Sequence, residues 1–127
     1  MNIGEKAVEL HGSGLNCAQS VLIACEEHTG IDYDLAVGIA NGFGGGVRCG
    51  EICGAASGGV MAVGACKKLR GCENPREQMS ERAKLFCEKF NQRFEGIRCA
   101  DIKGVKYTCN EMIEFAAKLA EETINEI

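Results

Sequence analysis

The sequence predicts an all-α fold, a single compact bundle of five or six helices around a glycine-rich central helix. Apolar residues recur with the helical period along most of the 127 residues, and glycine or proline separates the periodic segments. No segment alternates apolar and polar residues for long enough to indicate a strand. A chain of this length suits one core, so we expect residues 1–127 to form a single helical, cysteine-rich domain.

The first part of the chain contains three predicted helices whose ends carry recognisable signals. We expect a first helix over residues 2–11, closed by a Gly-Ser-Gly turn. Asn16 precedes the second helix, and Gln19 completes the pattern of a capping box, in which each side chain bonds the backbone of the other residue. Gly30 ends this helix, and Asp32 caps a third helix that runs into a glycine-rich break.

A fourth predicted helix runs from near Gly50 to Arg70 and is the central one. Gly50, Gly54 and Gly58 lie four residues apart and therefore share one helical face. Each helical glycine costs about 1 kcal/mol relative to alanine, so three on one face indicate a close approach. Tight helix packing is one interpretation. The other is a ligand, cofactor or second subunit on that face, which makes these glycines candidate cofactor-binding residues and leaves a homodimer open.

Two further helices are predicted in the last third of the chain. Asn74 followed by Pro75 is typical of a helix start, because proline is tolerated at the first helical position, and Gly96 ends this helix. Thr108 and Glu111 have the capping-box spacing for the last helix. Each helix has a core-facing stripe: Met79, Ala83, Phe86, Phe90 and Phe94 in the first, and Met112, Ala116, Leu119, Thr123 and Ile127 in the second.

Composition narrows the classes of function. The net charge of −4 argues against a nucleic-acid partner, because nucleic acids bind basic surfaces. The longest weakly polar run, Ile52–Cys66, is shorter than the roughly 20 residues of a membrane span, so we expect no membrane insertion. The N-terminal residues lack the apolar segment of a signal peptide. We therefore expect a cytoplasmic protein, whose thiols the cytosol keeps reduced.

The nine cysteines fall into two groups by their position relative to the predicted helices. Cys17 and Cys109 each follow a predicted N-cap, Cys49 and Cys53 flank the start of the central helix, and Cys99 lies in a loop. A helix N-terminus carries about half a positive charge, which favours the thiolate that attacks or ligates metal. These cysteines are therefore the candidates for one redox or metal site.

The remaining cysteines have a structural interpretation. Cys25, Cys66 and Cys87 lie among apolar or small residues, where a free cysteine behaves as a small buried hydrophobe. Cys72 lies in a turn beside a glycine and is left unassigned.

The segment from Cys53 to Gly58 reads C-G-A-A-S-G, and cysteines stand before and after it at Cys17, Cys99 and Cys109. With this order of motifs, the chain resembles the C_GCAxxG_C_C family of redox-active proteins over roughly residues 14–120. The resemblance implies that the four family cysteines are Cys17, Cys53, Cys99 and Cys109, with Cys49 an additional thiol. A similar cysteine-rich domain in split-Soret cytochromes binds an iron–sulfur centre, which favours iron here by analogy.

We expect a redox-active protein whose clustered cysteines bind an iron–sulfur cluster for electron transfer or redox sensing, because four thiolates suit such a cluster. Cys17, Cys53, Cys99 and Cys109 are then the metal ligands, with Cys49 as a further candidate. One alternative is a metal-free thiol–disulfide redox protein, in which the same four cysteines are catalytic and Cys49 is the resolving thiol. The other is a zinc-stabilised interaction module. The sequence does not identify the redox partner protein.

Overall fold

The computed structural model describes residues 1–127 and is all-helical, with nine α-helices, no strands and two isolated β-bridges. The predicted all-α class is therefore confirmed, but the predicted number of five or six helices is wrong. Three of the nine are single turns of four residues, which are α3 (Glu26–Thr29), α6 (Lys67–Arg70) and α8 (Cys99–Ile102). These short turns arise where the chain leaves and re-enters the helical conformation.

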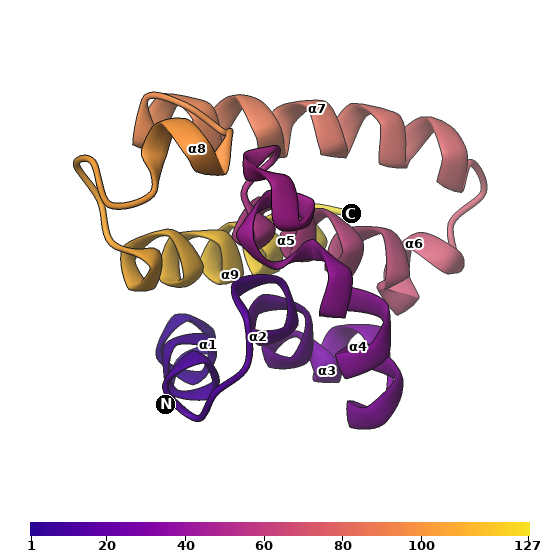
Figure 1. Cartoon of the computed structure of the whole chain (residues 1–127). Coiled ribbons are helices and arrows are strands. Elements are labelled where there is room, and N and C mark those ends of the chain that lie inside the picture. The colour runs from indigo at the N-terminus through magenta and orange to yellow at the C-terminus, as the bar shows by residue number, and fades with distance from the viewer.

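The longer helices lie in three layers (Figure 1). The upper layer is α7 (Pro75–Phe94), the middle layer holds α5 (Gly54–Ala65) and α9 (Cys109–Asn125), and the lower layer holds α1 (Ile3–Gly12), α2 (Cys17–Ala24) and α4 (Tyr33–Ala40). Helix α5 packs against α2, α9 and α7. A cluster of 27 buried hydrophobic residues fills the space between the layers.

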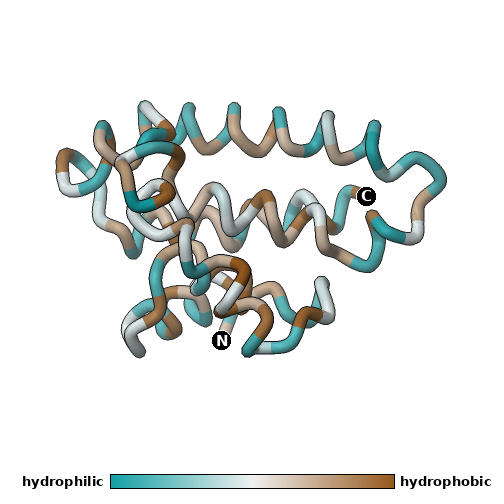
Figure 2. Tube along the Cα trace, turned by 45° about the vertical axis from the view of Figure 1, so that its right-hand side comes forward, coloured by the Kyte–Doolittle hydropathy of each residue, from teal (hydrophilic) through white to brown (hydrophobic).

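The apolar stripes of α7 and α9 face this core. Phe86, Phe90 and Phe94 are buried on α7, as predicted from their spacing. Figure 2 shows hydrophilic positions along the outer side of α7, which is the side that no other helix covers. The N-terminus of the last helix is also as predicted, because Thr108 and Glu111 form a complete capping box. No helix is both long and apolar enough to cross a membrane.

The predicted continuous helix from Gly50 to Arg70 is wrong at both ends. Gly50 has a φ of +76°, which a right-handed helix does not contain, and α5 begins only at Gly54. Cys66 is extended, with a ψ of 147°, and separates α5 from α6. The second predicted helix is also interrupted, because Cys25 leaves the helical conformation before α3 begins.

A left-handed turn precedes α5. Four successive residues, Gly45, Gly46, Val47 and Arg48, have φ values of 64°, 67°, 57° and 61°. This conformation costs little for glycine but roughly 1–2 kcal/mol for an ordinary L-residue. It is especially rare for a β-branched residue such as valine. The Arg48 guanidinium donates to the Asn41 carbonyl oxygen at 2.8 Å and ties the turn to the end of α4. The glycine-rich break predicted here is thus present, in a strained form.

Candidate functional site

The four cysteines Cys17, Cys53, Cys99 and Cys109 line one small cavity of about 20 Å³. This volume holds about one water molecule. The other lining residues are Gly45, Ala55, Lys103 and Met112. The structure therefore brings together the four cysteines that the sequence analysis selected, although they are far apart in sequence. Their role as ligands or catalytic thiols stays a prediction.

Each of these cysteines stands at the start of a helix. Cys17, Cys99 and Cys109 are the first residues of α2, α8 and α9, and Cys53 is the N-cap residue of α5. For α2 and α9, capping boxes fix the helix start and so fix the position of the cysteine. Four helix N-termini, each with free N–H groups and a partial positive charge, thus meet around the cavity.

A short backbone pairing connects Cys53 to Cys99. The Cys53 N–H donates to the Ile97 carbonyl oxygen and the Cys99 N–H donates to the Glu51 carbonyl oxygen, both at 2.7 Å. These bonds surround the antiparallel bridge between residues 52 and 98. Since successive residues of an extended chain point to opposite faces, Cys53 and Cys99 share one face of the bridge. Nothing in the local sequence indicates this pairing.

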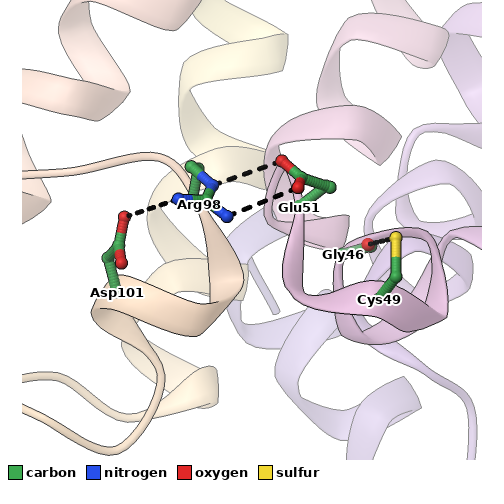
Figure 3. A network of polar contacts seen from close by, with 5 residues as sticks. All are labelled: Gly46, Cys49, Glu51, Arg98 and Asp101. Atoms are coloured by element: carbon green, nitrogen blue, oxygen red, sulfur yellow. Dashed lines mark hydrogen bonds and ion pairs between the residues drawn. The ribbon is translucent and has the colours of Figure 1, made fainter.

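An ion-pair network joins the two segments of the same bridge to α8 (Figure 3). Arg98 donates to both carboxylate oxygens of Glu51, at 3.2 and 3.3 Å, and lies 3.7 Å from Asp101 on α8. About half of each of these side chains is exposed, so the network contributes only a small stabilisation. The start of α8 is therefore held against residues 51–53, just before α5, mainly by the two backbone hydrogen bonds.

Cys49 does not line the cavity. It is exposed, and its thiol donates to the Gly46 carbonyl oxygen at 3.5 Å (Figure 3). The left-handed turn and the positive φ of Gly50 turn the chain between Cys49 and Cys53, so the two do not flank the start of the helix as predicted, and both precede α5. A role for Cys49 as ligand or resolving thiol would require the turn to move.

The three candidate cofactor-binding glycines do not share one face, which corrects the prediction. Gly50 lies outside α5, whereas Gly54 and Gly58 pack against α2. A Cβ atom at Gly58 would lie 2.6 Å from the Ala18 carbonyl oxygen, and one at Gly54 would collide with the Cys17 sulfur. The close approach on this face is between helices, and Gly54 provides the space that the Cys17 thiol occupies.

Burial weakens the acidity of the cavity thiols. It raises the pKa of Cys53 to about 11, although the backbone N–H groups of Ala55 and Ala56 at the start of α5 oppose the rise. Burial also raises the pKa of Cys99, and the positive charge of Lys103 opposes it. In each case the neighbouring cavity thiols raise the pKa further. Both thiols are therefore protonated at neutral pH.

The side chains are not arranged as a finished metal site. No three His, Cys, Asp or Glu side chains are grouped closely enough to hold a metal ion as they stand. The chemistry of the cavity is nevertheless that of a thiol site, because its lining contributes four thiols, one thioether and no carboxylate or imidazole.

Residues 15–123 match the model of a family described as "Putative redox-active protein (C_GCAxxG_C_C)". The chain belongs to this family. The match includes all four cysteines of the cavity. No curated protein and no solved structure matches the chain.

In this C_GCAxxG_C_C protein the other cysteines lie away from the cavity. Cys25 and Cys66 are completely buried, and Cys72 and Cys87 are half-buried. Burial raises the pKa of Cys87, which borders an apolar cavity of about 310 Å³ between α5 and α7. The burial of Cys25 and Cys66 agrees with their interpretation as packing residues, whereas Cys87 is less buried than predicted.

Sequence analysis missed Lys103, the only charged residue that lines the thiol cavity. It follows Cys99 by four positions, which is the spacing of neighbours on one helical face. That signal was hidden because the sequence around Cys99 looks irregular and α8 is only one turn long. A short helix starting at Cys99 would have placed Lys103 next to the candidate site.

Proposed function

We propose that the four cavity cysteines bind an iron–sulfur cluster and that the protein acts in electron transfer or redox sensing. The observation that carries this proposal is the meeting of Cys17, Cys53, Cys99 and Cys109 at one cavity. Four thiolates are the usual ligand set of such clusters. Membership of a redox-active family supports the redox part of the proposal.

The electrostatics of the cavity favour a cationic metal. Thiols with raised pKa values are poor nucleophiles, because attack requires the thiolate. A bound metal cation would add positive charge to that of Lys103 and the helix N-termini, and it would deprotonate the thiols that it binds. The N–H groups at the start of α5 lower the pKa of Cys53 and would donate to its sulfur in the bound state, which is one way in which proteins tune such a centre.

The donor set fits a cluster, whereas the present volume of about 20 Å³ does not. Part of the lining must move outward, and α8 is the element that can do so at least cost. It is one turn long and carries one of the four cysteines, its ion pairs are exposed, and apart from them two backbone hydrogen bonds attach the chain at its start to the segment before α5. We therefore place the entry to the site at α8.

A thiol–disulfide redox protein is the second candidate. The small cavity favours it, because a disulfide between two lining thiols needs less room than an iron–sulfur cluster. In this case an attacking thiolate and a nearby resolving thiol come from different helices among the same four cysteines. A zinc-stabilised module would also use these thiols and is a third outcome of the same test.

The deciding experiment is anaerobic purification followed by a visible spectrum and measurement of iron, zinc and acid-labile sulfide. Colour with iron and sulfide in equal amounts supports the proposal. Colourless protein with zinc supports the third candidate, and metal-free protein with countable thiols supports the second. Either colourless result, if it persists after anaerobic reconstitution with iron and sulfide, overturns the iron–sulfur proposal.

A further inference from the structure

The lining of the thiol cavity contains one charge. Lys103 is the only charged residue among the lining residues. Of the charged side chains close to it in sequence, Asp101 pairs with Arg98, Arg98 also pairs with Glu51, and Lys106 pairs with Glu95. A negative charge that approaches the thiols therefore meets one side-chain cation.

The backbone fixes Lys103 beside Cys99. The Lys103 N–H donates to the Cys99 carbonyl oxygen at 3.0 Å and closes the single turn of α8. A β-bridge with Tyr107 holds the Lys103 backbone on its other side. The side chain is exposed and forms no ion pair, so its charge is free to act at the mouth of the cavity. Its effect already reaches the Cys99 thiol, whose pKa it lowers against the larger effect of burial.

We infer that Lys103 determines the electrostatic selectivity of the cavity, so that the thiols react faster with anionic reactants than with neutral ones. The physical reason is that the ammonium group attracts an anion into the small volume in front of Cys99. The inference rests on the proposed function only in using the same thiols, and it does not require a bound cluster.

The test uses two aromatic disulfide probes on the reduced, metal-free full-length protein. Dithiobis(nitrobenzoate) carries two carboxylates, and dithiodipyridine is neutral. In either case the Cys99 sulfur loses its proton to water and attacks the probe disulfide. A mixed disulfide forms, and the other half of the probe leaves as a thiolate or its thione. Mass spectrometry of peptides gives the rate at Cys99 for each probe.

The expected result is that Lys103→Gln lowers the ratio of the anionic to the neutral rate at Cys99 by about three- to tenfold. The ratio isolates the steering effect, because any change in the acidity or exposure of Cys99 alters both rates. The difference should shrink in about 1 M salt, where the screening length is about 3 Å. Circular dichroism checks that each variant keeps its helix content.

Matched controls come from the chain itself. Lys106→Gln removes a nearby cation that pairs with Glu95 and does not line the cavity, and it should leave the ratio unchanged. Lys103→Arg keeps the charge and should keep the ratio. Cys72, in the turn between α6 and α7 at the far end of the molecule from α8 (Figure 1), is the internal reference thiol.

Three outcomes would overturn the inference. They are an unchanged ratio in Lys103→Gln, an equal loss in Lys106→Gln, and an equal fractional loss of the ratio at Cys72 in Lys103→Gln. A protein without iron and sulfide would overturn the proposed function, yet the ratio would still report on Lys103, so the two failures are distinguishable.

Discussion

Helices α2 and α5 each carry a cysteine at both ends, and the two ends differ in almost every physical respect. At their N-termini, Cys17 and Cys53 reach the cavity shared with two further thiols. At their C-termini, Cys25 and Cys66 are completely buried in the core. The comparison shows that the end of the helix, rather than the residue type, separates candidate functional thiols from packing thiols.

Helix polarity and burial both make Cys53 more acidic than Cys25. Backbone N–H groups at the start of α5 lower the pKa of Cys53, whereas no such donor lowers the pKa of Cys25. Burial raises the pKa of Cys25 to about 12, and the negative charge of Glu121 adds to the rise. A thiol with this pKa and no adjoining cavity is inert toward metal and disulfides. We therefore expect the N-terminal end to be the reactive end.

The largest expected effect is a complete loss of the redox centre. Serine at Cys17, Cys53, Cys99 or Cys109 should each abolish the bound iron and sulfide, because a ligand set fails as a unit. Serine at Cys25 should keep the centre and lower the free energy of unfolding by about 1–3 kcal/mol, because it buries a hydroxyl group. Metal analysis and urea unfolding measure the two effects. Loss of iron in Cys25→Ser with unchanged loading in Cys17→Ser would reverse the comparison.

The next effect concerns the contact between the two helices. Gly58→Leu should lower the free energy of unfolding by about 3 kcal/mol or more, because its Cβ alone would lie 2.6 Å from the Ala18 carbonyl oxygen, a backbone atom that cannot rotate away. The matched control is Gly38→Ala on the exposed side of α4, where no atom lies within 4 Å. The control should raise stability by about 0.5–1 kcal/mol. Urea denaturation of both variants decides whether α5 needs glycine at this position.

A smaller effect should appear at alkaline pH in the reduced protein. The folded-state pKa of Cys25 is about 12, raised from its ordinary 9.0, so the unfolded chain releases this proton first as the pH rises. The contribution of the protonated Cys25 thiol to the free energy of unfolding is fully present below pH 9 and is lost between about pH 9 and 12. We expect a difference of about 1–2 kcal/mol between pH 9 and 10.5, and Cys25→Ala should lack this part of the slope. Equal slopes in the two proteins would show that Cys25 ionises as easily in the fold as out of it.

Sequence analysis predicted well the features that depend on local chemistry. The caps at Asn16 and Thr108 act over three residues, so they can be recognised in the sequence, and they correctly placed Cys17 and Cys109 at helix starts. The all-α class followed from the same local periodicity. Recognition of the family then connected these cysteines with Cys53 and Cys99.

The missed features depend on contacts between distant residues. The pairing of Cys53 with Ile97 and of Cys99 with Glu51 is set by the packing of α8 against the chain before α5, and no residue pattern encodes it. The interruption of the central helix at Cys66 was equally hidden, because neither Cys66 nor its direct neighbours Ala65 and Lys67 are helix breakers. The glycine spacing suggested a ligand-binding face. The space beside Gly54 and Gly58 is instead filled by the backbone of α2 and the Cys17 thiol.

The smallest expected effect tests whether the reactive end is built at the expense of stability. Val47 has a φ of 57° in the left-handed turn beside the cavity and is 46% exposed, so it gains little from burial. Such strain is typical of functional segments. Val47→Gly should therefore raise the free energy of unfolding by about 1 kcal/mol, the reverse of the usual cost of a glycine. Val47→Ala keeps a Cβ in the strained conformation and should recover only part of this gain. If Val47→Gly instead destabilises the protein in urea unfolding, the turn is not strained. The segment before α5 then does not lower the free energy of unfolding.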